Sequence, residues 1–312
     1  MLEPDDDVLG RVLERTQLRG QVYCSTAARA PWGLRFQQAD KAMFHIVTDG
    51  ACWLVLGDDR RQLASGDIVL FPRGSAHALA DHPSTRRVAL EDWLAQPRVP
   101  GGALTLGGTI GTPARVICGS YTFDTPAPRN PVLRLLPDTL HLRGEANRAR
   151  PDLAATIAAL AREHARTRSG MSLVISRLLD VLFVQIVRAW ADDQPSGGAG
   201  WIGALHDSTL ARALALLHGD LARAWDVEGL ARAAGTSRAT LGRRFVAEVG
   251  EPPLSYLARL RLQEAARRLE RSDASIATIA HAVGYTSEFA FNRAFRRELG
   301  APPGAYRRAA QA

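Results

Sequence analysis

The chain has 312 residues, of which 46% are hydrophobic and 23% charged, so it is long enough for two globular domains and is neither disordered nor fibrous. It has no run of 18 apolar residues, its acidic start MLEPDDDVLG is unlike a secretory signal, and three cysteines do not make a disulfide scaffold, so we expect a cytoplasmic protein. The net charge of +7 favours an anionic partner, and the chain after residue 207 carries most of it, with 16 Arg against 10 Asp and Glu.

The first 145 residues are predicted to form strands. Short apolar runs are separated there by Gly, Pro, Asp and Asn, namely VYCSTA, WGLRF, MFHIV, ACWLVLG, DIVLF and RVICGSYTF. Turn signals at this spacing are typical of a β-barrel or a β-sandwich. A short helix over Asp6–Arg15 is expected before the first strand.

Two longer helices are expected next, over residues 151–168 and 171–191, and Ser169-Gly170 between them predicts a helical hairpin. The second helix carries an apolar face that could either form a homodimer interface or pack on the strands. This face consists of Val174, Leu178, Val181 and Gln185, with Leu182 and Ile186 beside them. The polar, Gly-rich stretch DQPSGGAG that follows is typical of a linker. We therefore predict a sensor domain over 1–150, the hairpin over 151–192, a linker over 193–206 and a helical domain over 207–312.

The helical domain contains an internal repeat. Leu230-Ala231 and Gly235 recur as Ile279-Ala280 and Gly284, and Ser237, Phe245, Gly250 and Pro252-Pro253 recur 50 residues later. In each copy, a glycine should end a short helix in a left-handed conformation and a serine should cap the next helix. A short helix, a tight turn and a second helix form a helix-turn-helix, and two copies joined by a long helix are a specific pattern.

The second helix of each copy predicts which side chains face DNA. Leu241 and Phe245 should be buried in the first copy, and Phe291 and Phe295 in the second. Each opposite face then presents an arginine at the same repeat position, Arg243 or Arg293, which can read a guanine edge in the major groove. The arginines that flank these positions suit phosphate contacts, and they are Arg238, Arg244, Arg296 and Arg297. Arg261 on the connecting helix is a weaker candidate for the same role.

With its stretches IAHAVGY, FNRAFRR and GAPPGAYRR, this segment resembles the DNA-binding domain of AraC/XylS-family transcription regulators. The resemblance covers about 100 residues and implies two units in successive major grooves of promoter DNA. It further implies that Ala239, Gly242 and Arg243 read one half-site and that Phe289, Ala290 and Arg293 read the other. Contact with RNA polymerase, and hence activation, is implied by this resemblance alone.

The N-terminal stretch GDIVLFPRGSAH resembles the second motif of cupins, in which the histidine, here His77, points into a β-barrel. Only His45 stands near the place of the first motif, whose second histidine and glutamate are missing. His45 and His77 are therefore predicted to line a pocket or a metal site, and we expect no cofactor, because the set of metal ligands is incomplete. The missing ligands also argue against an enzyme.

More of the N-terminal half is similar to the sensor domain of an AraC-family branch that includes an activator responsive to reactive chlorine. The similarity rests on VYCSTAARAPWGLRF, FHIVTDGACWLVL, RVICGSYTFD and NPVLRLLPDTLHLRG. It implies that Cys24 and Cys118 sense an oxidant, since a thiol oxidised to a sulfenic acid can condense with a second thiol. Cys52 has no counterpart. The alternative is that all three cysteines are buried and inert.

We thus predict an α+β multidomain protein, with a cupin-like β-barrel (double-stranded β-helix), a helical hairpin and an all-α double helix-turn-helix domain. Its predicted function is sequence-specific DNA binding as a transcription regulator, an activator that senses an oxidant through cysteines. One alternative is the same regulator with a small-molecule effector and no redox chemistry. The other is a cupin metalloenzyme fused to a DNA-binding domain.

Overall fold

The computed structural model describes residues 18–95, 104–108, 111–123, 130, 133, 136–165, 168–193 and 207–311. The chain divides into two compact units, an N-terminal domain over Thr16–Gln194 and a C-terminal domain that contains Pro195–Ala312. The helix expected over Asp6–Arg15 lies outside the described residues, as does the linker expected over 193–206 except for Asp193, which caps the end of α6. No helix in the described part of the chain is long and apolar enough to span a membrane.

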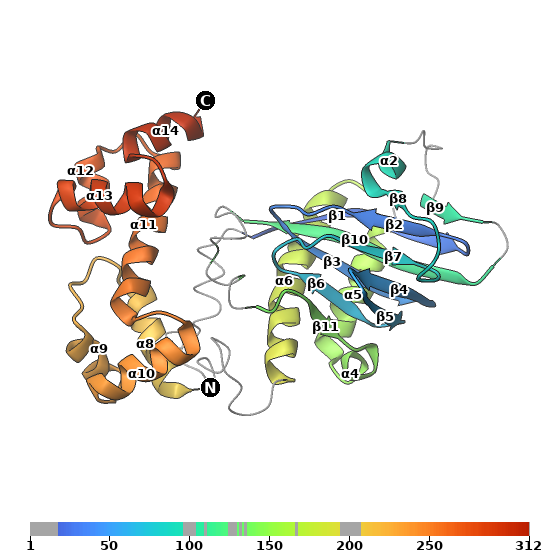
Figure 1. The fold of residues 1–312 in the computed structure, drawn as a ribbon, viewed down its shortest axis with the longest axis horizontal. Coiled ribbons are helices and arrows are strands. Elements are labelled where there is room, and N and C mark those ends of the chain that lie inside the picture. Colours follow the sequence, from blue (N-terminus) through green and yellow to red (C-terminus); the bar gives the residue numbers. More distant parts are fainter. Residues whose placement is uncertain are drawn as a thin grey trace. The chain divides into compact units, whose positions relative to one another are not determined.

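The described strands of the N-terminal domain form two sheets (Figure 1). The first has the order β11-β6-β3-β10-β1-β9, with β1 Arg19–Arg29, β3 Ala42–Asp49, β6 Ile68–Phe71, β9 Leu104–Gly107, β10 Pro113–Thr122 and β11 Leu140–Leu142. The second has the order β5-β4-β7-β2-β8, with β2 Gly33–Phe36, β4 Ala51–Leu56, β5 Asp59–Ala64, β7 His77–Ala80 and β8 Val88–Ala89. All six apolar runs singled out in the sequence contain strands of these sheets.

The closed barrel expected from the sequence is not confirmed. Each sheet ends in edge strands that pair with one neighbour only among the described residues. The edge strands β8 and β11 have two and three residues, and neither pairs with a described strand of the other sheet. The strands therefore form two open sheets. The expected layout of a strand-rich domain followed by a helical one is confirmed.

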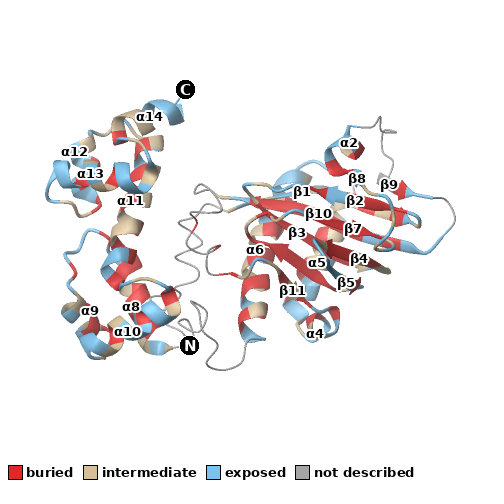
Figure 2. Cartoon of the chain, in the orientation of Figure 1, coloured by how far each residue is buried: buried red, intermediate tan, exposed pale blue. Residues whose placement is uncertain are grey.

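The core of the N-terminal domain lies between the two sheets, where Figure 2 shows the strands to be mostly buried. It combines Phe36 and Leu54 of the second sheet with Phe71, Val116 and Cys118 of the first. Along β10, alternate residues leave this core, as the two-residue period of a strand requires. Tyr121 thus lies on the other face of the sheet, where its ring contacts that of Phe183 at a centroid distance of 5.0 Å.

Two helices cover this outer face, α5 over Pro151–His164 and α6 over Met171–Asp192. A Cβ placed on Gly20 of β1 would lie 2.3 Å from the Cβ of Leu179, so the absence of a side chain at Gly20 lets α6 approach β1 closely. Leu182 and Ile186 are fully buried, whereas Val174 and Val181 are 44% and 48% exposed. The apolar face expected on this helix is therefore divided: one part packs inside the domain and the other remains on its surface.

Short helices complete the N-terminal domain, α2 over Leu90–Leu94 and α4 over Gly144–Arg148. The C-terminal domain consists, in its described part, of α8 Ser208–Gly219, α9 Val227–Ala233, α10 Arg238–Val249, α11 Pro253–Arg271, α12 Ile276–Ala282, α13 Glu288–Leu299 and α14 Pro303–Gln311. The long α11 joins the two copies of the repeat (Figure 1).

Candidate nucleic-acid interface and sensor residues

The first helix-turn-helix unit is formed by α9 and α10. Gly235 lies in the turn with φ of +78°, a conformation that few residues other than glycine adopt without strain. The side chain of Ser237 then accepts a hydrogen bond from the backbone N–H of Thr240 and caps α10. Leu241 and Phe245 are fully buried. The expected stop signal, cap and core positions are confirmed.

The second unit, α12 and α13, repeats this construction. Gly284 has φ of +90°, and Ser287 caps α13 by accepting a hydrogen bond from the N–H of Ala290. Phe291 and Phe295 are fully buried, with ring centroids 5.4 Å apart. Each of the two units therefore holds its second helix firmly by a cap at its start and aromatic packing along one side.

The opposite faces of α10 and α13 are accessible. Arg243 and Arg293 are exposed, as are Ala239 and Ala290, while Gly242 is half-buried. Phe289 is 77% exposed, an unusual position for an aromatic ring unless it contacts another molecule. Arg238, Arg296 and Arg297 are exposed as well, and no ion pair or hydrogen bond within the described residues engages their guanidinium groups.

Two of the predicted phosphate-binding arginines have partners inside the domain. Arg244 forms an ion pair with Asp207, which also caps α8, at 2.8 Å between Nη1 and Oδ2. The guanidinium of half-buried Arg261 donates from Nε to the carbonyl oxygen of Leu221 at 2.7 Å and from Nη2 to that of Arg223 at 2.8 Å. The structure gives Arg261 a role in packing α11 against the segment after α8, and we do not assign it to phosphate.

The two cysteines predicted to sense an oxidant lie on adjacent interior strands of the first sheet. Strand β10 pairs antiparallel with β1 on one side and with β3 on the other. In this register Cys118 is directly opposite Cys24 on β1 and directly opposite His45 on β3. Sequence reasoning proposed both cysteines but not this alignment, because the register of strands so far apart in the chain cannot be read from their apolar pattern. The side chain of Cys24 lies outside the described part of the chain.

Cys52 lies in a different sheet from the other two cysteines but, like Cys118, belongs to the core between the sheets. It lies on β4 in the second sheet, is 1% exposed, and contributes to the core between the sheets. Burial, and to a lesser extent the charge of Asp67, raises the pKa of its thiol to about 12. Because the thiolate is the reactive form, this raised pKa disfavours reaction of Cys52 at neutral pH.

His45 and His77 are brought together from different sheets. Both are buried, and their Nε2 atoms lie 2.6 Å apart. The His77 ring stacks on the rings of Phe71 and Phe36, at centroid distances of 3.9 and 4.8 Å, and its Nδ1 is 2.7 Å from the carbonyl oxygen of Ser75. Burial lowers the pKa of His77 to about 4, and burial together with the nearby His77 lowers the pKa of His45 well below its usual value. Both rings are neutral at physiological pH.

This pair does not fit a metal ion. Two imidazoles bound to one tetrahedral zinc would have their nitrogens about 3.3 Å apart, whereas here they are in direct hydrogen-bonding contact. No group of three or more His, Cys, Asp or Glu side chains among the described residues is arranged to hold a metal.

We accordingly expect the purified full chain to retain no stoichiometric zinc, iron or manganese after dialysis, as elemental analysis would measure. The physical reason is that two neutral imidazoles without a third ligand bind these metals weakly. A His77→Ala variant provides the control for adventitious metal. One equivalent of metal that is retained by the parent protein and lost in this variant would contradict the expectation.

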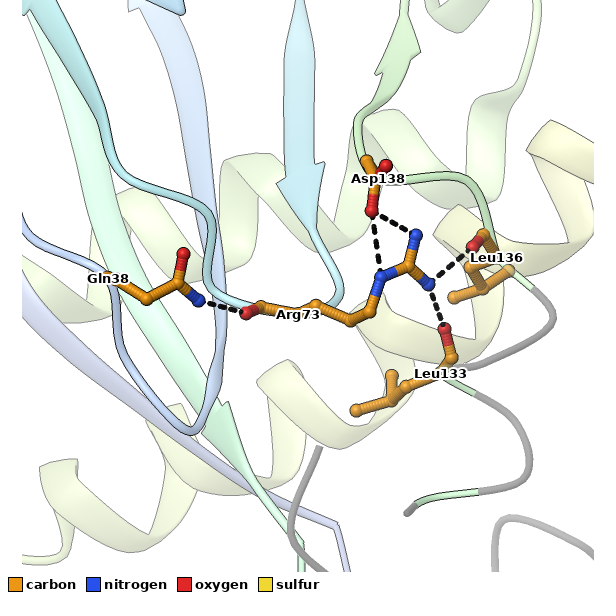
Figure 3. Close-up of polar contacts among 5 residues, drawn as sticks. All are labelled: Gln38, Arg73, Leu133, Leu136 and Asp138. Carbon is orange, nitrogen blue, oxygen red and sulfur yellow. Dashed lines mark hydrogen bonds and ion pairs between the residues drawn. The ribbon is translucent and has the colours of Figure 1, made fainter. Parts of the chain in front are cut away.

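The turn that carries the cupin-like motif is held by Arg73, between β6 and β7 (Figure 3). Its guanidinium donates to the carbonyl oxygens of Leu133 and Leu136, each at 3.0 Å, and forms an ion pair with Asp138. Its own carbonyl oxygen accepts a hydrogen bond from Gln38 at 2.8 Å. This arginine therefore fixes the turn next to His77 to the chain that leads into β11, a contact that the sequence did not reveal.

Comparison with known proteins gives matches to both domains. Residues 7–192 match a cupin family and residues 230–309 match a helix-turn-helix domain family. A putative AraC-like transcription regulator of Streptomyces lividans is 34% identical over 97% of this chain and 98% of its own length. The RCS-specific HTH-type transcriptional activator RclR of Escherichia coli (strain K12) is 28% identical over 96% of this chain and 97% of its own length. The crystal structure of the DNA-binding domain of AdpA, in complex with a target DNA, is 42% identical in sequence where it matches. The match covers 33% of this chain and 92% of the AdpA chain, with a TM-score of 0.32.

Proposed function

The chain belongs to the AraC-like family of transcription regulators, and from that membership we propose that it activates transcription from promoter DNA in response to an oxidant. The observation that carries the DNA-binding part is the pair of capped helices α10 and α13, each with an exposed arginine at the same repeat position. The relatives reported above are named as transcription regulators, which supports a regulator rather than an enzyme.

We propose that α10 and α13 enter successive major grooves about one helical turn apart, so that the bound duplex spans roughly 20 base pairs. Arg243 and Arg293 then read base edges, together with Ala239 and Gly242 in one half-site and with Phe289 and Ala290 in the other. Selection of binding sequences from a random duplex pool by the full chain, followed by footprinting, tests this. Two protected segments about 10 base pairs apart are expected, and a single protected segment would contradict the proposal.

The phosphate contacts have their own signature. We expect Arg296→Ala to weaken binding to all duplexes by a similar factor and to reduce the slope of log K against log salt by about one. The reason is that a side chain bound to phosphate releases a counterion but carries no sequence information. Binding to the selected duplex and to a scrambled one, at several salt concentrations, measures both effects.

The matched control is Arg271→Ala, which removes an exposed arginine from the last turn of α11. It should leave the slope unchanged. Discrimination between the two duplexes that falls in Arg296→Ala, with the salt slope intact, would reassign Arg296 from phosphate to a base.

For the sensor we propose that an oxidant joins Cys24 to Cys118. Residues directly opposite each other in an antiparallel pair have Cα atoms about 4.5 to 5.5 Å apart, which lies inside the range that a disulfide spans. The similarity to a regulator whose name describes it as RCS-specific supports an oxidant as the signal. The raised pKa of Cys52 supports leaving that thiol out of the reaction.

A bond between β1 and β10 would act on both faces of the sheet. The two strands that carry the cysteines also carry Gly20 and Tyr121, which contact Leu179 and Phe183 of α6. Because α6 ends at Asp192, where the chain leaves the N-terminal domain, a change in the separation or twist of the strands would be felt at the start of the connection to the DNA-binding helices.

The other partners remain predictions. The exposed Val174 and Val181 on α6 favour a homodimer through this helix, and Val181→Glu should then shift the mass measured in solution from dimer to monomer.

Contact with RNA polymerase follows only from the activator role. If the effector is instead a small molecule and no redox chemistry is involved, the Cys24→Ser protein should respond to the effector as the parent protein does.

A further inference from the structure

The protonation state of the buried histidine pair can be derived from its outer end. The carbonyl oxygen of Ser75 can only accept a hydrogen bond, so the Nδ1 of His77 must carry a proton to donate to it. A neutral imidazole carries one proton, so the Nε2 of His77 is an acceptor. The hydrogen bond between the two rings is then donated by the Nε2 of His45.

When His45 donates the hydrogen bond between the two rings, its other ring nitrogen, Nδ1, is left in the core without a hydrogen-bond partner. With its proton on Nε2, His45 presents a bare lone pair at Nδ1, and no described residue donates a hydrogen bond to that atom. His45 is 1% exposed, so water does not compensate from the surface. A buried acceptor without a donor destabilises the folded protein, so its presence calls for an explanation.

The residue opposite His45 in the sheet is Cys118. Side chains opposite each other in an antiparallel pair lie on the same face with Cβ atoms about 4.5 to 5.5 Å apart, and Cys118 belongs to the core between the sheets, on the same side as His45. Among the described residues, His77 and Cys118 are the titratable groups facing His45, while β2 and β6 contribute the uncharged rings of Phe36 and Phe71.

We propose that His45 accepts the proton of the Cys118 thiol when this thiol forms the bond with Cys24, an inference that rests on the thiol pair proposed above. The oxidant, a hypohalous acid, first converts the Cys24 thiol to a sulfenyl halide and releases water. The Cys118 sulfur then attacks the Cys24 sulfur, the halide leaves as an anion, and the Cys118 proton passes to Nδ1 of His45. The resulting imidazolium is stabilised by its hydrogen bond to Nε2 of His77.

The consequence is a reaction rate with an unusual pH dependence. An ordinary thiol attacks as the thiolate, so its rate rises about tenfold per pH unit below its pKa. A neutral neighbouring base removes this dependence at every pH at which it remains neutral. Because the pKa values of both histidines are lowered, the pair is neutral at neutral pH.

The test isolates the attack by Cys118. In a Cys52→Ser background, one equivalent of 4,4′-dithiodipyridine forms a mixed disulfide at Cys24 and releases a first thiopyridone. Attack by Cys118 then releases the second, and its first-order rate is read by absorbance between pH 6 and 8. We expect this rate to be nearly independent of pH. In His45→Gln, whose amide still donates to His77 but offers no acceptor at the Nδ1 position, we expect the rate at pH 7 to fall about 100-fold and to rise about tenfold per pH unit.

Two further variants make the result decisive. His82→Gln removes an exposed histidine that is hydrogen-bonded to Ser84, so the pH profile of the parent should be retained. His77→Asn keeps a donor for the carbonyl oxygen of Ser75 but removes the acceptor for His45. The release of the second thiopyridone should then slow roughly tenfold at pH 7. If His45→Gln does not fold, this variant provides the test. Unchanged rates and pH profiles in the folded histidine variants, or a parent rate that rises tenfold per pH unit, would overturn the role of His45 alone. No second thiopyridone from the parent would overturn the thiol pair itself.

Discussion

Replacing Arg243 or Arg293 with alanine is expected to cost about 1 to 3 kcal/mol of discrimination between the selected duplex and a scrambled one, or roughly 5- to 150-fold in relative affinity. A bidentate arginine satisfies two acceptors of guanine, and its loss leaves both without a protein donor. Both guanidinium groups are exposed on the face opposite the buried aromatic rings, so the substitutions should leave the fold intact. Competition binding at fixed salt measures the effect.

The two variants should also differ in where they relax specificity. Arg243→Ala should affect bases in one half-site and Arg293→Ala bases in the other, because the two residues lie on different helices. Arg232→Ala is the control, since Arg232 is exposed on α9 and forms an ion pair with Glu228. If relative affinity is unchanged in both test variants, the assignment of base-reading residues is wrong.

Loss of the transcriptional response to hypochlorite is the expected result for Cys24→Ser. Without the thiol at position 24, no bond to Cys118 can form, and the N-terminal domain remains in its reduced state at every oxidant concentration. A reporter gene behind the selected duplex measures the response in cells. In the purified protein, thiol titration should show two thiols consumed by the oxidant and recovered with a reductant.

Cys52→Ser is the matched control, because it also removes one thiol, but from the other sheet, where burial raises the pKa of Cys52 to about 12. It should respond like the parent protein. Normal induction in Cys24→Ser would reject the thiol switch and leave a small-molecule effector as the explanation, with the DNA-binding proposal unaffected.

The C-terminal domain could be predicted closely from the sequence because its signals are local. A glycine that ends a helix, a serine that caps the next one and aromatic residues four positions apart act within a few residues, and the repeat displays each of them twice. The partners of Arg261 could not be predicted in this way, because Leu221 lies 40 residues earlier in the chain. Its place on the connecting helix made it a weaker candidate for phosphate, whereas its guanidinium donates to backbone carbonyl oxygens of the segment after α8.

In the N-terminal domain, sequence patterns predicted strands but not their neighbours. The alternation of apolar residues fixes which face of a strand is buried, yet it leaves strand order and register open. The alignment of Cys24 with Cys118 and of Cys118 with His45 depends on β10 lying between β1 and β3. The contact between His45 and His77 depends further on the packing of one sheet on the other.

The position of Cys118 in the middle of the first sheet also determines how long a signal would last. A bond from Cys24 to Cys118 closes a loop of roughly 95 residues, which in the chain-entropy treatment stabilises the folded protein by about 4 to 5 kcal/mol. Cys118 is 1% exposed, so a reducing thiol cannot reach its sulfur without local opening of the strands. A reductant would therefore have to attack the Cys24 sulfur or wait for such opening. A bond that stabilises the fold by this amount would persist until one of these events occurs, so the signal could outlast the oxidant itself.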